Sequence, residues 1–357
     1  MLAASMSSAS LLRTRFAETH PGVSLLDPHD RAGIEGHLLR RSLAERGELP
    51  ARIERAGSGN MNLTLRVTLA SRSLILKQGR PWVEKYDHIE APWDRTLIEG
   101  RFYEAARGVG AVSSRMPEIL DLDPHNHVLA LSDTGSLGDF TAIYEAGVIP
   151  AATVDELLDW LKALSTVTIP APEKDRFTNR AMRALNHEHI FRLPLARDNG
   201  LDLDRITEGL GRAAEGLKAD EAYADRVRAL GSRYLEDGVS LVHGDYFPGS
   251  WMKAADGIRI IDPEFCFLGA REFDYGVMLA HLALARTPVE PAQRVLDATR
   301  SERLDTALVL NFAGVEIMRR LIGVAQLPLS HDLDTKRRLL DVSRSLVLTP
   351  RAELSCW

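Results

Sequence analysis

The chain has little of several features that mark specialised classes of protein. Its 357 residues include two cysteines, Cys266 and Cys356, which excludes a disulfide-rich secreted scaffold and favours incidental thiols in a reducing compartment. No apolar run approaches the roughly 18–20 residues that a membrane-spanning helix needs. The formal net charge of −6 provides no overall positive field to attract nucleic acid. We therefore expect neither a membrane nor a nucleic acid among the partners of this protein.

The composition is otherwise that of a globular protein with a large core. Hydrophobic residues make up 45% of the chain and charged residues 26%, and the length suggests two lobes or domains. The first twenty residues are rich in Ser and Ala, carry Arg13 and Arg15, and have no acidic residue before Glu18. That pattern is typical of an organelle transit peptide or of a frayed terminus. We favour the frayed terminus and expect a cytoplasmic protein.

The pattern after an N-terminal tail at residues 1–29 predicts a first lobe at residues 30–132. Apolar residues at helical spacing indicate a helix at residues 34–43, and period-two alternation indicates strands at 61–69 and 73–77. A helix is expected at residues 91–106, followed by strands at 118–122 and 127–131. This lobe should be a small antiparallel sheet with one helix packed on it.

Residues 133–357 should form a second, mainly helical lobe, which makes the fold class α+β. Helical patterns run through residues 154–165, 203–231, 273–284, 303–324 and 333–348. The strongest strand patterns of this part are two short apolar runs, at residues 241–242 and 258–261. Each of them leads into acidic residues, and the chemistry of the chain is concentrated there.

The first acidic motif is His243-Gly244-Asp245, on a loop after an apolar strand. An aspartate in this place can orient a hydroxyl nucleophile for phosphoryl transfer, whereas on its own it would more often cap a helix. We expect Asp245 to be the catalytic carboxylate because a second acidic motif follows at hairpin distance. His243 is expected to pack and hydrogen-bond beneath the site rather than to act as a base.

The second acidic motif is Asp262-Pro263-Glu264, directly after the apolar run that ends at Ile261. Pro263 prevents the strand from continuing, and two carboxylates beside nucleotide phosphates suit Mg²⁺. Ser250 stands five residues after Asp245, where the protein-kinase catalytic loop has an asparagine that binds a second metal ion. We expect Asp262, Glu264 and Ser250 at the metal, and whether Ser250 binds it directly stays open.

A nucleotide-binding pattern precedes both motifs. Lys77 ends an apolar strand, as does the lysine that pairs with ATP phosphates in kinases, and Glu99 in the next helix is its expected partner. One hairpin earlier, Gly57, Gly59 and Asn60 form a glycine loop that could cover phosphates with backbone N–H groups. A plain turn would explain the glycines equally well, and only their position before Lys77 favours the phosphate loop.

Two further features lie C-terminal to the acidic motifs. Asp274, in Phe273-Asp274-Tyr275-Gly276, is expected to cap the following helix and to brace the catalytic loop. Arg319 and Arg320 are consecutive in a helical pattern. Consecutive residues of a helix point about 100° apart, so we expect at most one of the two to face the site squarely.

Taken together, these residues resemble the aminoglycoside-phosphotransferase-like small-molecule kinases, which share the protein-kinase fold. Within that superfamily the likeness is greatest to the 5-methylthioribose kinases. The likeness rests on His243-Gly244-Asp245, Gly249-Ser250, the run Ile261 to Phe265 and Arg319-Arg320, and it extends from about Gly57 to Ala325. The family has serine where Ser250 stands, so this serine does not indicate a dead kinase. Tyr246-Phe247-Pro248 departs from the family pattern.

The resemblance implies a bilobal protein-kinase-like fold and an ATP- and Mg²⁺-dependent kinase. It implies that the acceptor is the C1 hydroxyl of 5-methylthioribose, in methionine salvage, and that the arginine pair binds this sugar. Three alternatives stay open: an aminoglycoside or choline-type acceptor, another sugar, or a nucleotide-binding module without activity. We expect a small-molecule hydroxyl acceptor as partner, and a homodimer is one open alternative for the oligomeric state.

Overall fold

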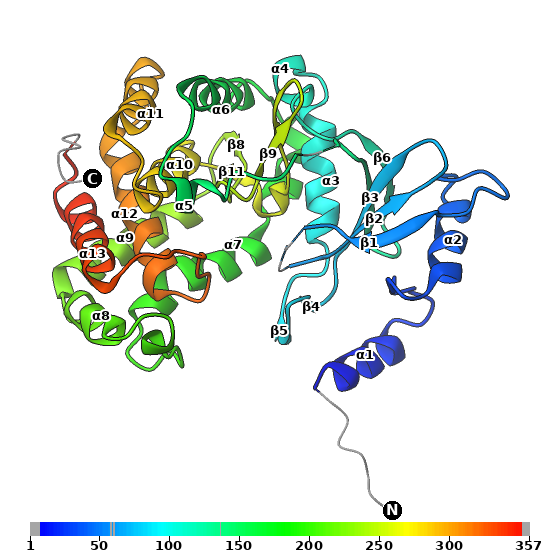
Figure 1. Cartoon of the computed structure of the whole chain (residues 1–357), viewed down its shortest axis with the longest axis horizontal. Helices are drawn as coiled ribbons and strands as arrows, with labels where there is room; N and C mark the ends of the chain where they lie inside the picture. Colours follow the sequence, from blue (N-terminus) through cyan, green and yellow to red (C-terminus); the bar gives the residue numbers. More distant parts are fainter. Residues whose placement is uncertain (1–7, 58, 60, 136, 352–357) are drawn as a thin grey trace, which may run out of the picture. The chain divides into compact units, whose positions relative to one another are not determined.

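The computed structural model describes residues 8–57, 59, 61–135 and 137–351 (Figure 1). Backbone contacts divide the chain into two compact units. The first comprises Met1–Glu104 with Pro117–Gly135, and the second comprises Ala105–Met116 with Ser136–Trp357. None of the described helices is both long and apolar enough to cross a membrane.

The first unit is built on an antiparallel five-stranded sheet. Its strand order is β1-β2-β3-β7-β6. The strands are β1 (Arg52–Arg55), β2 (Leu63–Thr68), β3 (Ser73–Gln78), β7 (Val128–Ser132) and β6 (Ile119–Asp123). A separate hairpin joins β4 (Trp82–Val83) to β5 (Tyr86–Glu90). The sheet expected from alternating residues at 61–69 and 73–77 is confirmed, and β1 is an edge strand that the sequence did not reveal.

Helices α2 (Arg31–Arg40) and α3 (Arg95–Ala106) cover opposite faces of this sheet. Ile34 of α2 shares a buried core with Ala130 of β7, whereas Gly100 of α3 lies against the side chain of Leu129, the neighbouring residue. Successive side chains of a strand point to opposite faces, so the two helices must lie on different sides. The same alternation turns Lys77 of β3, which pairs with Leu129 in the ladder, toward α3.

The first helix of the described residues is α1 (Ser8–Thr19). Its Phe16 is buried and meets the ring of Trp93 edge-on, with the ring centroids 4.9 Å apart. This aromatic contact attaches the helix to the first unit, in a stretch whose sequence indicated a frayed terminus.

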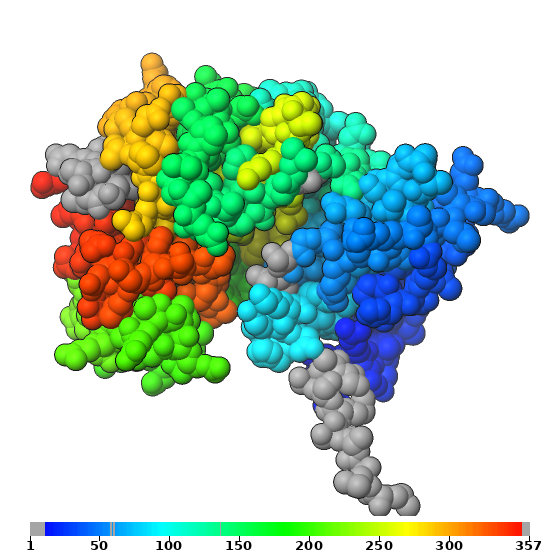
Figure 2. All heavy atoms as spheres, viewed as in Figure 1, coloured from blue at the N-terminus to red at the C-terminus, as the bar shows by residue number. Residues whose placement is uncertain are grey.

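The second unit is mainly helical, as expected for an α+β fold. Its helices are α4 (Gly110–Ser113), α5 (Ile143–Ala146), α6 (Ala151–Leu164), α7 (Arg180–His187), α8 (Leu210–Lys218), α9 (Glu221–Leu235), α10 (Glu272–Leu284), α11 (Val289–Ser301), α12 (Thr306–Ile322) and α13 (Leu333–Leu348). Two antiparallel strand pairs, β8 (Ser240–Val242) with β11 (Phe267–Gly269) and β9 (Trp251–Ala254) with β10 (Gly257–Ile260), complete it. Figure 2 shows the β9–β10 hairpin at the surface beside α6.

One expected helix is wrong as a single element. Residues 203–231 form a short 3₁₀ turn, α8 and α9 instead of one continuous helix. The break falls at Asp220, whose carboxylate accepts the backbone N–H of Tyr223 at 3.1 Å and so begins α9 as its N-cap. An aspartate competes for backbone N–H groups in this way, and here that competition ends one helix and begins the next.

Helices α10 and α12 form the buried centre of the second unit. Every residue of α10 from Phe273 to Leu284 is buried, and so is every residue of α12 from Val309 to Ile322. A helix that is buried all round loses its polar face, so each polar side chain on it needs a partner inside the protein. Asp274, His281 and Glu316 are such side chains, and all three lie at the site.

Candidate active site

The loop that carries Asp245 is fixed by its own backbone and by α10. Gly244 has φ +85, and a Cβ on it would lie 2.2 Å from the backbone oxygen of Phe265, so only glycine fits. Asp274, in the first turn of α10, accepts the backbone N–H groups of His243 at 2.6 Å and of Gly244 at 2.9 Å. Burial raises the pKa of Asp274 to about 7, although both N–H bonds favour the charged form.

His243 is fully buried and contacts backbone groups through both ring nitrogens. Its Nε2 lies 2.9 Å from the carbonyl oxygen of Ile261, and its Nδ1 accepts the backbone N–H of Asp245 at 3.4 Å. Since a carbonyl can only accept, the proton is on Nε2. The ring therefore joins the loop of Asp245 to the end of the strand run that precedes Asp262.

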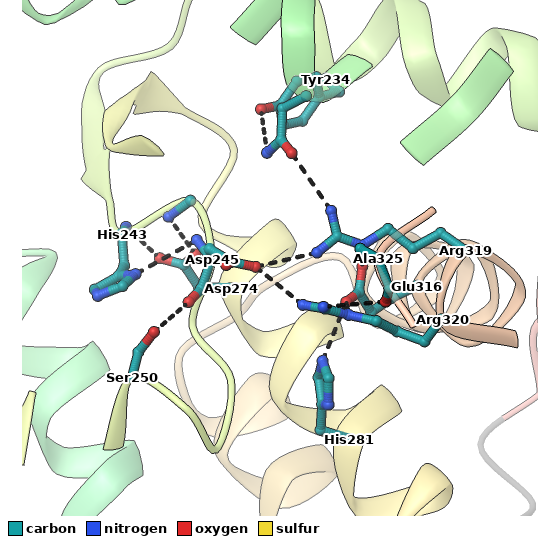
Figure 3. Close-up of polar contacts among 12 residues, drawn as sticks. Tyr234, His243, Asp245, Ser250, Asp274, His281, Glu316, Arg319, Arg320 and Ala325 are labelled. Atoms are coloured by element: carbon teal, nitrogen blue, oxygen red, sulfur yellow. Dashed lines mark hydrogen bonds and ion pairs between the residues drawn. The ribbon is translucent and has the colours of Figure 1, made fainter. Parts of the chain in front are cut away.

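Both arginines of α12 reach the carboxylate of Asp245, as Figure 3 shows. Nη2 of Arg319 and Nη2 of Arg320 each donate to Oδ1 of Asp245 at 3.2 Å. The expectation that at most one arginine faces the site is wrong, because the two long side chains leave the helix in different directions and converge at their ends. Oδ2 of Asp245 has no hydrogen-bond partner in the described part of the chain, and the side chain is 21% exposed.

Glu316 is a charged residue of the site that sequence reasoning missed. It stands three and four residues before Arg319 and Arg320 on the same helix, and it forms ion pairs with both. Burial by itself would raise the pKa of this carboxyl, but the two guanidinium charges outweigh it and hold the pKa well below its ordinary value. The spacing Glu-x-x-Arg-Arg in a helical pattern was the available signal.

The acidic motif at Asp262 lies where β10 ends and a 3₁₀ turn, Pro263–Phe265, begins. Asp262 has φ 64, a left-handed conformation that is uncommon outside glycine and interrupts the extended backbone of the strand. Glu264 is buried, and the two carboxylates are oxygen donors of the kind that Mg²⁺ prefers. The described residues contain no group of three or more His, Cys, Asp or Glu side chains able to hold a metal ion. Further ligands would be other oxygen donors, such as the hydroxyl of Ser250, phosphates and water.

Ser250, the third expected metal ligand, is buried and has another role in the loop. Its hydroxyl donates to the backbone oxygen of Asp245 at 3.0 Å, and its own backbone oxygen accepts the N–H of Ile261 at 3.0 Å. These bonds tie the loop of Asp245 to the residue before Asp262. The serine could reach a cation only through a lone pair of the hydroxyl oxygen.

The first unit contains the expected lysine–glutamate pair. Nζ of Lys77 donates to Oε1 and Oε2 of Glu99 at 2.7 and 2.6 Å, and both side chains are buried. Gly57 has φ +70, the left-handed conformation of a turn, and open space surrounds Gly57 and Gly59. Asn60 lies outside the described residues.

The sheet, the lysine–glutamate pair and the two acidic loops all lie in one stretch of the chain, residues 52–307. A model of the phosphotransferase enzyme family matches this stretch, and the chain belongs to this family. It is a small-molecule kinase by that membership.

Among curated proteins, the chain is similar to the methylthioribose kinase of Exiguobacterium sibiricum, with 24% identity over 333 residues that cover 80% of this chain and 83% of the relative. It is 26% identical to that of Bacillus pumilus over 328 residues, covering 78% and 79%. A crystal structure of a spectinomycin phosphotransferase in complex with ADP and spectinomycin has the same fold, with a TM-score of 0.55 and 13% identity over 90% of this chain and 99% of that one.

Proposed function

We propose that this protein is an ATP-dependent kinase that phosphorylates the C1 hydroxyl of 5-methylthioribose in methionine salvage. The similarity to methylthioribose kinases supports this acceptor. The observation that carries the proposal is the contact of both arginines with Oδ1 of Asp245. It leaves Oδ2 available to a hydroxyl and would place guanidinium hydrogen-bond donors beside the acceptor.

The charge around Asp245 favours an uncharged acceptor. Two guanidinium groups, Arg319 and Arg320, face two carboxylates, Asp245 and Glu316, so the positive and negative charges of this cluster balance. A cationic aminoglycoside or a choline would find no net negative charge in this cluster to bind it. A neutral sugar needs no such charge and can accept hydrogen bonds from the guanidinium groups.

In the proposed reaction the acceptor oxygen attacks the γ-phosphorus of ATP. A bond forms between the C1 oxygen and this phosphorus, the bond from the phosphorus to the β,γ-bridging oxygen breaks, and ADP leaves. Oδ2 of Asp245 aligns the hydroxyl and takes its proton. Catalysis would come mainly from positioning and from neutralising phosphate charge.

The remaining residues would bind the nucleotide. Lys77, oriented by Glu99, would contact the α- and β-phosphates, and the loop of Gly57, Gly59 and Asn60 would cover them. Asp262 and Glu264, with Ser250 as a further oxygen donor, would hold Mg²⁺, which when bound neutralises phosphate charge. These roles are proposals drawn from the sequence motifs and from the resemblance to the kinase family.

An ADP-release assay tests the function. The purified protein with Mg·ATP is offered 5-methylthioribose, ribose, choline and an aminoglycoside, and ³¹P NMR locates the new phosphate. We expect ADP release with 5-methylthioribose well above the rate without acceptor, and a phosphate on C1. Turnover of choline or the aminoglycoside instead would replace the proposed acceptor. ATP binding without release for any acceptor would favour the inactive nucleotide-binding module.

A further inference from the structure

Glu316 lies against the Nε atoms of both arginines, with a hydrogen bond to Arg320 and an ion pair to Arg319. Its Oε1 accepts from Nε of Arg320 at 2.7 Å, and its Oε2 lies 2.8 Å from Nε of Arg319. The carboxylate is 2% exposed. Because each guanidinium is engaged at Nε, its Nη2 end is directed away from Glu316, and both Nη2 atoms meet at Oδ1 of Asp245 (Figure 3).

The distances indicate which carboxylate sets the orientation. Charge-assisted hydrogen bonds are typically about 2.7–2.9 Å long. The hydrogen bond of Arg320 with Glu316 falls in this range at 2.7 Å, whereas both hydrogen bonds with Asp245 are 3.2 Å. Nε of Arg319 lies 2.8 Å from Oε2 of Glu316 as an ion pair without hydrogen-bond geometry, and this distance too is shorter than its distance to Asp245. The tighter partner of each arginine is therefore Glu316. An arginine side chain carries roughly 2 kcal/mol of rotamer entropy, so without that partner its end would sample several directions.

Glu316 is itself fixed from its other side. Nε2 of His281 lies 3.1 Å from Oε1 of Glu316, and Nδ1 of His281 lies 2.6 Å from the hydroxyl of Tyr144. A carboxylate only accepts, so His281 donates from Nε2 and its Nδ1 accepts the tyrosine O–H. The ring of Phe247 closes the cluster, 4.7 Å from the guanidinium carbon of Arg320 and 5.3 Å from the ring of His281.

We infer that Glu316 is a positioning residue for phosphoryl transfer, which aims both guanidinium groups at Oδ1 of Asp245 and so keeps Oδ2 directed at the acceptor hydroxyl. The inference rests on the proposed kinase function. Glu316 touches neither acceptor nor nucleotide in this scheme and acts only through the arginines. Its removal should therefore affect turnover and acceptor use and leave nucleotide binding unchanged.

The kinetic test compares Glu316→Gln with the wild type and with the Arg319→Gln/Arg320→Gln double variant. We expect kcat to fall roughly 10- to 100-fold in Glu316→Gln, with the KM for Mg·ATP within about twofold of the wild type. Added to the double variant, Glu316→Gln should lower kcat by less than about twofold more, because its targets are gone. An equal loss in both backgrounds would show a purely structural role and overturn the inference.

The matched control is Glu302→Gln. Glu302 is also mostly buried and paired with an arginine, Arg271, and with the hydroxyl of Tyr275 at 2.6 Å, but it contacts no residue of the cluster. The Glu302→Gln variant should therefore keep kcat within about twofold of the wild type. If Glu316→Gln does not fold, Glu316→Asp replaces it as the test variant, because it keeps the charge but moves the carboxylate back by one methylene. It should likewise lower kcat and leave the KM for Mg·ATP unchanged.

A second readout needs no acceptor. In the free protein, the Nε–H resonance of Arg320, which is hydrogen-bonded to Glu316, should be resolved and protected from solvent exchange once it is assigned through an Arg320→Lys variant. In Glu316→Gln it should exchange at least about tenfold faster, while that of Arg271 stays unchanged. Unchanged exchange at Arg320 would overturn the inference even if no acceptor is turned over. Failure of the wild type in the acceptor assay, with the exchange result as expected, would count against the proposed function alone.

Discussion

Lys77 and Glu99 form a buried, two-pronged ion pair, with Nζ 2.7 and 2.6 Å from the two carboxylate oxygens. Their side chains are 4% and 0% exposed. A buried charge whose partner is removed is costly, by about 3–5 kcal/mol, so each member of the pair requires the other. The pair joins the end of β3 to α3, and under the proposed function it presents the ammonium group to nucleotide phosphates.

Glu99→Gln is expected to weaken nucleotide use. The neutral amide holds the ammonium group less firmly, so kcat/KM for ATP should fall roughly tenfold or more, about 1.4 kcal/mol of transition-state stabilisation. The measurement is ADP release at varied ATP. Glu84→Gln is the control, because the side chain of Glu84 is only 6% exposed and pairs with Arg80 at 2.8 Å in the same unit. Equal losses in the two variants would remove the special role of Glu99.

Asp245→Asn is expected to abolish turnover while leaving Mg·ATP binding nearly intact. An amide cannot take the proton of the acceptor hydroxyl, and general-base catalysis contributes typically about 10²–10⁴-fold. Rates come from ADP release and affinity from calorimetry. The control is Asp237→Asn. Asp237 is an exposed aspartate that is also paired with an arginine, 2.6 Å from Nη1 of Arg183, so this variant should keep the wild-type rate. A wild-type rate in Asp245→Asn would mean that another group is the catalytic carboxylate.

Tyr246 and Phe247 are expected to differ in their effect on the acceptor. The side chain of Tyr246 is fully buried, stacked on Trp160 at 5.4 Å, and its hydroxyl donates to the backbone oxygen of Leu157 at 3.0 Å. Tyr246→Phe should therefore cost about 1 kcal/mol of unfolding free energy and leave the acceptor KM unchanged. Phe247 covers the guanidinium of Arg320, and Phe247→Leu should alter the acceptor KM severalfold.

The control for Phe247→Leu is Phe140→Leu. Phe140 also lies against a cation, but this cation is Lys253, whose Nζ is 5.2 Å from the ring. Steady-state kinetics at varied acceptor separates the two variants. An acceptor KM that changes in Tyr246→Phe but not in Phe247→Leu would reverse the assignment of these two neighbours.

His281 should make the stability of the protein depend on pH. Burial lowers the pKa of His281 to about 4 from 6.5, so between these values the unfolded chain binds a proton that the folded chain does not. The contribution of His281 is fully present above about pH 6.5 and is lost as the pH falls toward 4. The loss is on the order of 3 kcal/mol over that window.

Urea unfolding between pH 4.5 and 7 of the wild type and of His281→Gln measures this dependence. The variant should lose stability less steeply as the pH falls. Asp274 provides a contrast of opposite sign: its pKa is raised to about 7, so its contribution to stability declines as the pH rises toward 7. Asp274→Asn should therefore make the loss of stability at low pH steeper. Parallel curves for the wild type and His281→Gln would contradict the assignment to His281.

Short-range patterns in the sequence determined much of the fold. The alternation through residues 61–69 and 73–77 predicted β2 and β3, because the side chains of a strand alternate between two faces whatever its neighbours are. The positions of Lys77 at a strand end and Glu99 in the following helix predicted a pair that the structure contains. The motifs at Asp245 and Asp262 placed two acidic loops at the ends of apolar strands, and both loops are found there.

Only the tertiary structure decided how the centre of the site is arranged. The contacts of Asp245 with Arg319 and Arg320 join residues 74 and 75 positions apart, and the bond between Tyr144 and His281 spans 137 positions. No local period encodes such pairings, because they depend on how α5, α10 and α12 pack. The burial of Tyr246 and the convergence of two consecutive arginines on one oxygen follow from that packing. The sequence by itself determined which chemical groups this protein has, and the packing of its helices decided which of them meet.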